Sequence, residues 1–491
     1  MSALHSRAAL PRATVSPVRP PQVSDEARSL LRLAAPIMLI ALVSMGMSVT
    51  DTAMVAAFFG TEALAAVAVG SDLYSIVFYL GAGVLGGLAP FYTAAVVRAD
   101  PTQRRRLLHI GWVTAAGLAL LLVPLVWTAP DWLQWLGLQP TLLQQGRGYT
   151  QAMALTLVPM LGVVLYRTVL TAAEKPRVFL QVTMAMLPLN AAANALFMLG
   201  AGPLPALGPT GAGVSSLVVA LASLAILVRV ARVAEGRVPG GAPGPAIDWT
   251  TLVAVLRVGL PIGIATLAEV GIFLGATLYA ATLGAADVAA HTLTLRTAGV
   301  AYAVPAALLQ ASMVRMARAH TLGDPALVRA VTRGSLLLSF AFGAVICAVL
   351  VVAAGPLSQA FFGDSAQGLA AAGLAAGLLV MLGVMEWVVG PGSAAAGLLR
   401  GRKDTRAPML YGLFGHWAVG APLGIYLCEA QGLGVTGLWI GLSSGTALTT
   451  VLMLRRLRAH HPKRLAPRAG DGTNDPFAGD SGSVAKAVAL R

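Results

Sequence analysis

Charged residues are scarce in this chain of 491 residues. Asp, Glu, Lys and Arg together make up 11% of the sequence, whereas 57% of it is hydrophobic and the mean hydropathy is +0.77. A soluble protein carries about 25% charged residues, because it must cover its apolar core with polar surface. So small a share excludes a water-facing globular protein, and we expect a protein whose solvent is a lipid bilayer.

Residues that commonly build catalytic or metal sites are also few. The two cysteines, Cys347 and Cys428, both lie in apolar segments, which excludes a disulfide framework and a cysteine metal site. The chain has no GxxxxGK[ST] motif, and therefore no P-loop for ATP. Of the histidines, His291 and His416 lie well inside apolar runs, and we interpret each as a partner in a packing hydrogen bond. We therefore expect no enzyme and no cofactor.

Apolar runs long enough to cross a bilayer follow one another along the chain. A spanning helix needs roughly 20 apolar residues, and open strands would leave backbone groups unpaired in lipid. Twelve runs qualify, namely 29–58, 72–97, 108–128, 150–171, 177–199, 207–231, 251–283, 286–317, 328–354, 367–399, 407–427 and 434–457. The sequence thus predicts an all-α integral membrane protein with twelve transmembrane helices.

Basic residues gather in alternate connections between these runs. They are Arg98, Arg104, Arg105, Arg106, Lys175, Arg177, Arg232, Arg237, Arg318, Arg402, Lys403 and Arg406. The opposite connections carry acids such as Glu62 and Glu429. The positive-inside rule then predicts a multi-pass protein of the cell inner membrane with both termini in the cytoplasm. It also explains the net charge of +14 without nucleic acid as a partner.

The two halves of the chain repeat each other. Residues 30–37 read LLRLAAPI and residues 255–262 read VLRVGLPI, so that Pro36 pairs with Pro261. Gly60 pairs with Gly284 further on. We expect two homologous six-helix lobes, a first at 29–232 and a second at 251–458, joined by a cytoplasmic linker at 233–250. Residues 1–28 and 459–491 are expected to be cytoplasmic tails, the second of them disordered. Such repeats build the central cavity of many secondary transporters.

The candidates for functional charges within the membrane are Asp51, Glu269, Arg296 and Glu386. A charge in mid-membrane costs at least about 2.5–3.5 kcal/mol and marks a functional site by default. A rise of about 1.5 Å per residue places Asp51 in the outer half of the first lobe. Asn190, Asn194 and Ser216 fall at the same level, which indicates a polar group that couples transport to H⁺ or Na⁺. The other interpretations are an outer-end cap for Asp51 and helix packing for the three neutral residues.

The second half places Glu269, Glu386 and Arg296 near the midplane by the same arithmetic. The two acids are typical of a site for Na⁺ or a cationic drug, with Arg296 neutralising one of them. The alternatives are a structural ion pair between Glu269 and Arg296 and a water-facing Glu386 on a tilted helix.

These residues resemble the motifs of the multidrug and toxic compound extrusion (MATE) family, especially its NorM-like bacterial branch. The resemblance rests on Pro36, Asp51-Thr52, Gly60, 65–70, Leu189-Asn190, Asn194, Gly211, Ser216, 259–261, Glu269, Gly284, Ala290-His291, 399–401 and 403–405. It covers residues 29–457 and implies export of cationic, amphipathic drugs in exchange for H⁺ or Na⁺. In the family, the positions of Asp51, Asn190 and Asn194 form an outer-half cation or proton site, and Glu269 matches the acid of the seventh helix.

Several positions depart from the family pattern. The family often has an acid at Asn194, and a Thr at Ser216. Its tenth-helix Asp aligns near Val389, whereas this chain has Glu386 about one turn earlier. Arg296 beside the second-lobe acids argues against Na⁺ at Glu269, whereas the Asp51 group favours H⁺; the sequence leaves both ions open at both sites.

We therefore expect an ion-coupled antiporter whose lobes form a V and open alternately to each side of the membrane. Its partners would be small organic cations, drugs and membrane lipid, and we expect a monomer. The competing hypothesis is a lipid-linked precursor flippase of the same superfamily. That function favours a strongly cationic cavity, whereas the interior here holds mainly acids and Arg296.

Overall fold

The computed structural model describes residues 22–201, 203–235, 248–362 and 365–459. These residues form helices and turns, with no β-strand longer than one isolated bridge between Ala201 and Leu204. The all-α prediction is thus confirmed for the described residues. Most of the two predicted tails and much of the predicted linker 233–250 lie outside them, although residues 23–28 of the first predicted tail already belong to a helix. The predicted lobe boundaries stay a prediction.

The first half of the chain forms the helices that we call the N-lobe. They are α1 (Val23–Gly86), α2 (Ala89–Val97), α3 (Pro101–Trp127), α4 (Ala129–Trp132), η1 (Leu133–Leu136), α5 (Pro140–Gln145), α6 (Arg147–Ala172), α7 (Pro176–Leu199) and α8 (Thr210–Glu235). The three short elements α4, η1 and α5 connect α3 to α6.

The second half forms the C-lobe. Its helices are α9 (Trp249–Ala280), α10 (Ala285–Ala301), α11 (Ala303–Leu322), α12 (Pro325–Phe362), α13 (Ala366–Gly401), α14 (Arg406–Leu413), η2 (Phe414–Gly420), α15 (Ala421–Glu429) and α16 (Gly434–Ala459). The segment η2 is a π-helix, and α14, η2 and α15 follow one another without a gap.

A glycine reverses the chain after the first crossing of each lobe. Gly60 has φ +80° and ψ −174° inside α1, which divides α1 into two crossings. Gly284 has φ +149° and ψ 167° between α9 and α10. Side chains rarely adopt such positive φ angles, which glycine reaches without strain. The predicted pairing of Gly60 with Gly284 is therefore visible in the backbone.

Ten helical stretches of the described chain are long and apolar enough to span a membrane. One of them, Val23–Val97, crosses twice because of the turn at Gly60. The stretch from α14 to α15 adds a crossing that its π-helical interruption hides from a search by helix length. The fold is thus the predicted arrangement of twelve transmembrane helices.

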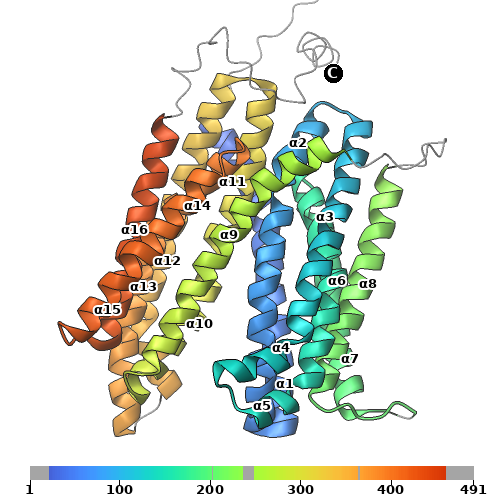
Figure 1. Cartoon of the computed structure of the whole chain (residues 1–491). Coiled ribbons are helices and arrows are strands. Elements are labelled where there is room, and N and C mark those ends of the chain that lie inside the picture. Colours follow the sequence, from blue (N-terminus) through green and yellow to red (C-terminus); the bar gives the residue numbers. More distant parts are fainter. Residues whose placement is uncertain (1–21, 202, 236–247, 363–364, 460–491) are drawn as a thin grey trace, which may run out of the picture.

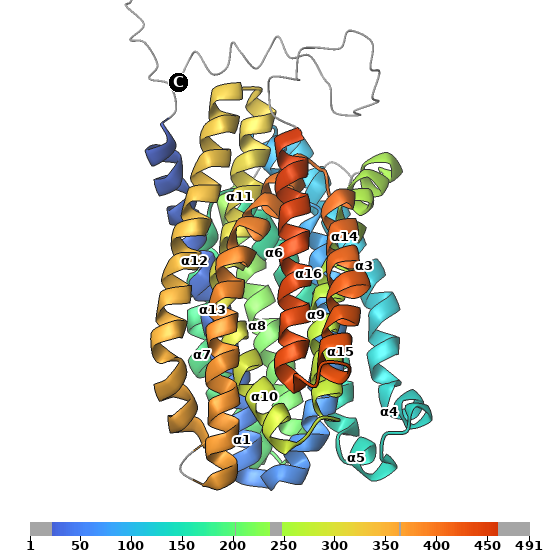
Figure 2. The ribbon, with the colours of Figure 1, turned by 90° about the vertical axis from the view of Figure 1, so that its left-hand side faces the viewer.

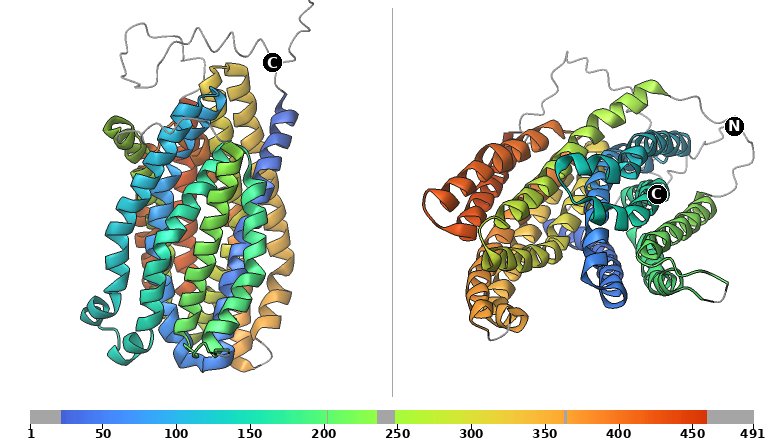
Figure 3. Two further views of the ribbon diagram at one scale, coloured as in Figure 1. Left: turned by 90° about the vertical axis from the view of Figure 1, so that its right-hand side faces the viewer. Right: turned by 60° about the horizontal axis from the view of Figure 1, so that its bottom comes forward.

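The two lobes stand side by side (Figure 1). The start of α9 and the ends of α8 and α16 lie at one end of the bundle, at the top of Figure 1, which we call the terminal face. The turn within α1 and the start of α10 lie at the other end, the opposite face. Figure 2 shows the C-lobe helices α12 to α16 from the outside, and the views in Figure 3 show the N-lobe helices and the separation of the two groups near the opposite face.

The lobes touch closely where α1 meets α9. Gly83 and Gly87 of the N-lobe face Gly259 and Gly263 of the C-lobe, four residues apart on each helix. A Cβ atom on Gly83 would lie only 2.6 Å from the Cα of Gly263. Small residues at this spacing let two helix backbones pack directly against each other in lipid.

Candidate functional site

The acid of the first helix lies in a polar group inside the N-lobe. Asp51 stands nine residues before the turn at Gly60, and its side chain is half-buried. Asn194 on α7 donates a hydrogen bond from Nδ2 to Asp51 Oδ1, and the side chain of Asn190 also hydrogen-bonds to the carboxyl group. The structure thus brings together three of the four residues predicted for this group. The alternative of Asp51 as an outer-end cap is wrong, because its partners are side chains of another helix.

Two oxygen atoms in this group have no hydrogen-bond donor. Asn190 and Asn194 are 2% and 0% exposed, and the Oδ1 atom of each is buried without a partner among the described residues. A buried acceptor without a donor costs roughly 1–3 kcal/mol. The arrangement therefore fits a bound proton or cation, which would supply a donor or a positive charge to these oxygens.

Ser216 does not join the group in the way that the sequence predicts. Its hydroxyl donates to the Ala212 carbonyl oxygen of its own helix, at 3.1 Å. The neighbouring Ser215 is fully buried and donates to the Asn190 carbonyl oxygen, at 3.4 Å. Adjacent residues on a helix point about 100° apart, so the register of α8 decides which serine faces α7.

The polar group also includes residues that the sequence did not single out. Tyr149 on α6 hydrogen-bonds to Ser71, and its hydroxyl interacts electrostatically with both Asp51 and Asp72. Asp72 lies in the second crossing of α1 and is exposed. The signal that would have found it is the repeat: Asp72 is 12 residues past Gly60, and Arg296 is 12 residues past Gly284.

The C-lobe holds a second cluster of charges. Glu269 on α9 hydrogen-bonds to Tyr302, the residue between α10 and α11. Arg400, near the end of α13, interacts electrostatically with both of them. Glu386 on α13 is 2% exposed and interacts electrostatically with Glu269. The two acids predicted for the substrate cavity therefore belong to one cluster.

Arg296 is not the base that serves this cluster. It is exposed on α10, forms no ion pair with Glu269 or Glu386 in the described chain, and acts instead on Asp72 of the N-lobe. Arg400 takes the place that the sequence predicted for Arg296. The reason is the packing of α13 against α10 and α11, which carries Arg400 toward Tyr302.

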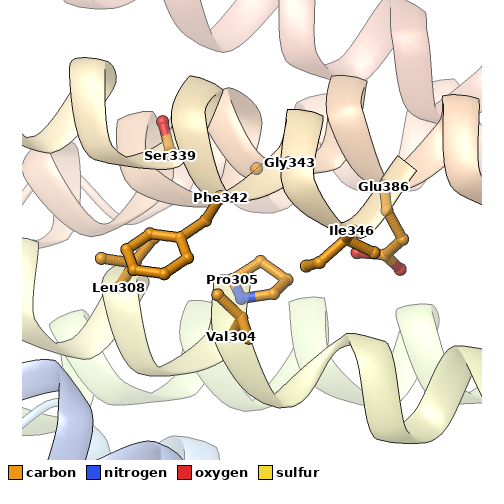
Figure 4. A pocket seen from close by; sticks show the side chains of 9 residues that line it. Val304, Pro305, Leu308, Ser339, Phe342, Gly343, Ile346 and Glu386 are labelled. Atoms are coloured by element: carbon orange, nitrogen blue, oxygen red, sulfur yellow. The ribbon is translucent and has the colours of Figure 1, made fainter. Parts of the chain in front are cut away.

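Glu386 lies at the end of a narrow crevice between α11, α12 and α13 (Figure 4). The crevice has no room for a water molecule, and apart from Glu386 it is lined mainly by apolar groups, among them Pro305, Phe342 and Ile346. The Oε2 atom of Glu386 is buried without a hydrogen-bond partner among the described residues. The alternative of a water-facing Glu386 is thus wrong.

His291 and His416 make packing hydrogen bonds, as the sequence predicted. His291 is fully buried, accepts a hydrogen bond from Trp439 Nε1 at 3.1 Å on Nδ1, and lies 3.0 Å from Thr277 Oγ1 through Nε2. His416 Nε2 lies 3.3 Å from Thr446 Oγ1. The described residues contain no group of His, Cys, Asp and Glu arranged to hold a metal ion.

The sequence profile of the MatE family matches the chain twice, over residues 36–196 and 261–426. The chain belongs to the MatE family. The two matches begin at Pro36 and Pro261, the prolines that the internal repeat pairs. This family consists of membrane transporters, so the chain is a multi-pass transporter and not an enzyme, as expected from the sequence.

Similar proteins agree with this assignment. "Multidrug resistance protein NorM" of Burkholderia vietnamiensis is 33% identical over 444 residues, which cover 89% of this chain and 95% of that protein. "Probable multidrug resistance protein NorM" of Bradyrhizobium diazoefficiens is 30% identical over 441 residues, which cover 89% of this chain and 94% of that protein. The solved structure of the eukaryotic MATE transporter AtDTX14 matches with a TM-score of 0.76 and 16% identity, over 89% of this chain and 96% of that one. This last likeness confirms the fold of twelve helices in two lobes.

Proposed function

We propose that this MatE transporter exports cationic and amphipathic drugs in exchange for H⁺ or Na⁺ across the inner membrane. Both termini and the terminal face lie in the cytoplasm, as the basic connections predict. The two relatives described above carry names that refer to multidrug resistance. The protein works as a monomer in membrane lipid, and its lobes, 29–232 and 251–458, open alternately to the two sides.

The observation that carries this proposal is the Asp51 group. A half-buried carboxylate stands beside two buried amide oxygens without donors, inside one lobe of a two-lobe carrier. A proton bound to Asp51 would donate to one of these oxygens, and Na⁺ would be surrounded by the carboxylate and the amides. Either occupant removes the buried negative charge, which is expensive in lipid. Asp51, Asn190 and Asn194 are therefore the proposed coupling residues, with Ser216 at the margin of the group.

The C-lobe cluster is the proposed substrate side of the exchange. Glu269 and Glu386 supply two acids against the single base Arg400. An ionised Glu386 beside Glu269 would attract an organic cation. Arg296 is exposed on α10 and acts electrostatically on Asp72 of the N-lobe. Glu269 remains the second position at which Na⁺ is an alternative occupant.

The driving force suffices for export without ATP. A tenfold ion gradient supplies about 1.4 kcal/mol per ion, and a potential of about 100 mV adds about 2.3 kcal/mol for each charge moved. Lipid-linked precursor flipping remains the weaker hypothesis, because Asp51, Asp72 and the two C-lobe acids would repel phosphate groups.

The test is dye efflux from proteoliposomes of the full chain, loaded with ethidium, under a proton gradient alone and then a Na⁺ gradient alone. We expect one gradient to drive efflux above that of protein-free liposomes. Failure of both gradients, in protein that is folded by circular dichroism, would contradict the antiport proposal. A parallel assay with a fluorescent lipid-linked phosphate would reveal flipping if the competing hypothesis holds.

A further inference from the structure

A buried arginine ties the two lobes together at the terminal face. Arg315 on α11 is 9% exposed, and Glu26 in the first turn of α1 is 6% exposed. Arg315 Nη2 donates to Glu26 Oε1 at 2.7 Å, and Nε donates to Oε2 at 3.1 Å. A planar guanidinium that meets a carboxylate in this way forms a strong, oriented pair.

The same arginine holds a second acid of the N-lobe. Its Nη1 atom lies 3.1 Å from Oε1 of Glu174, in the turn between α6 and α7. Arg318, one turn further along α11, lies 3.5 Å from the same oxygen. We call these four residues the terminal latch. It joins two separate segments of the N-lobe to one helix of the C-lobe, so the lobes cannot part at this face without breaking it.

Apolar contacts extend inward from the latch. Leu30, Leu33 and Ile37 of α1 pack with Leu308, Ala311 and Val314 of α11 in one buried cluster. Arg315 follows Val314 directly and closes this cluster at its end. The seam between the lobes is therefore sealed on the side of the terminal face.

One acid and one base occupy equivalent positions in the two lobes. Asp72 in the N-lobe and Arg296 in the C-lobe are 12 residues past the equivalent glycines Gly60 and Gly284, about 18 Å from the opposite face. Repeat-related positions of a parallel repeat are equivalent about an axis along the membrane normal. Both side chains are exposed and their charges act on each other, but the two groups are not joined by an ion pair within 4.0 Å in the described part of the chain.

Near this pair the lobes already approach each other. The Cε atom of Met45, in the first crossing of α1, would lie 3.5 Å from a Cβ on Gly299, one turn from Arg296. Closure of the opposite face would carry Asp72 and Arg296 toward the axis from equivalent positions at equal depth. Their opposite charges make that approach favourable.

We propose that the terminal latch and the Asp72–Arg296 pair are alternating inter-lobe ion pairs, of which one forms as the other breaks. This inference rests on the proposed rocking of the two lobes. A carrier that visits both open states needs them to be close in free energy. The attraction that is given up when the terminal face opens must then be balanced by attraction between the lobes at the opposite face. These two clusters provide such a balance.

The experiment measures the distance between the lobes at the terminal face, in the full chain reconstituted without drug. Spin labels are attached at Thr102→Cys in the N-lobe and Leu322→Cys in the C-lobe, after Cys347 and Cys428 are replaced by alanine; both label sites are exposed. Double electron–electron resonance then gives the populations of the short and the long distance. We expect Arg315→Gln to raise the ratio of long to short by about tenfold, within the usual range of coupling between sites.

The second arm reverses this effect. Adding Asp72→Asn to Arg315→Gln removes the pair that holds the other state, so the short distance should return. The combined exchange Asp72→Arg with Arg296→Asp, in the same background, restores an ion pair and should keep the long distance. A merely structural role for these residues predicts lower thermal stability with unchanged distance populations.

Arg456→Gln is the matched control. Arg456 pairs with Asp404 at 3.0 Å, but both residues belong to the C-lobe. An equal shift in this control, or no shift with Arg315→Gln, overturns the proposal. If Arg315→Gln does not fold, Glu174→Gln replaces it, because that change leaves the Arg315–Glu26 bond in place. Drug efflux is measured separately, so a carrier that fails to transport is distinguished from one that lacks the latch.

Discussion

The N-lobe and the C-lobe hold their buried acids in opposite ways. Asp51 is surrounded by amides and hydroxyls, and its nearest described partner is neutral Asn194. Glu269 and Glu386 share their cluster with Tyr302 and the base Arg400. The N-lobe acid therefore needs an ion from outside to be neutralised, whereas the C-lobe cluster carries part of its compensation within the protein. This difference favours ion coupling in the N-lobe and cation recognition in the C-lobe.

The largest effect should come from Asp51→Asn. The amide keeps the shape of the side chain but binds no proton or Na⁺, so ion-driven efflux should fall by about 100-fold, near the upper end of typical coupling between sites. The measurement is the initial rate of ethidium efflux from energised proteoliposomes. Glu62→Gln is the control, because this acid is exposed just past the turn at Gly60. Full efflux by Asp51→Asn would contradict the assignment of ion coupling to the N-lobe.

Glu386→Gln tests the other side of the comparison. If the C-lobe cluster recognises the substrate, the KM for a cationic dye should rise by about tenfold, the loss of about 1.4 kcal/mol of attraction. The maximal rate and its dependence on the ion gradient should change little. An intact KM combined with a lost response to the ion gradient would instead move ion coupling into the C-lobe.

Arg400→Gln should reveal the internal compensation as a loss of stability. Arg400 and Glu269 are both half-buried and interact electrostatically without an ion pair within 4.0 Å in the described chain, so the loss should be about 1 kcal/mol. The double variant Glu269→Gln with Arg400→Gln should recover much of this loss, because the uncompensated acid is then also removed. The measurement is thermal unfolding in detergent, compared across the two single variants and the double variant. Purely additive losses would show that the two groups do not interact.

Substitutions of the two adjacent serines of α8 should have different, smaller effects. Ser215→Ala removes the buried hydroxyl that contacts the Asn190 carbonyl oxygen, and we expect a loss of about 1 kcal/mol of stability. Ser216→Ala removes only a bond within its own helix, so both stability and efflux should stay close to those of the wild type. Equal effects of the two changes would mean that the register of α8 does not decide the site.

The smallest effect concerns how each lobe begins. Asp248 caps α9 of the C-lobe by accepting from the Thr250 and Thr251 amides, whereas α1 of the N-lobe begins at Gln22 without a side-chain cap. Hydrogen bonds from Thr250 and Thr251 lower the pKa of Asp248 from 3.8 to about 2. Its contribution to stability is thus complete above about pH 4 and is lost as the pH falls through about 2.

Asp248→Ala should therefore cost about 1 kcal/mol of stability, equally at pH 5 and at pH 8. Thermal unfolding at the two values checks this. A cost that differed between them would mean that another group titrates with the cap. Asp25→Ala in the first turn of α1 is the comparison for the uncapped lobe, and we expect a smaller loss there.

Several features were accessible from the sequence because they depend on local pattern. The twelve apolar runs, the paired glycines and the family motifs are periodic or contiguous signals, and all of them are confirmed. Depth arithmetic along single helices also placed Asp51 at the level of Asn194. That prediction worked because a helix in lipid has a fixed rise and a restricted tilt.

The direction in which each side chain points about its helix axis was harder to predict. Ser215 rather than Ser216 faces Asn190, and Arg400 rather than Arg296 serves Glu269. Depth says at which level a side chain lies, but not in which direction it points. Rotation is set by packing against neighbouring helices, which one sequence does not show.

The amino-acid sequence by itself determined that the chain crosses the membrane twelve times, in two related halves, with acids inside the apolar runs of both. The bilayer causes this result, because unpaired backbone polar groups and charged side chains are energetically unfavourable in its hydrocarbon core. The tertiary structure alone decided which acids meet amides, which acid meets Arg400, and that Arg315 joins both lobes. Those choices depend on contacts between residues as far apart in the chain as Glu26 and Arg315, and such contacts exist only after the helices have packed.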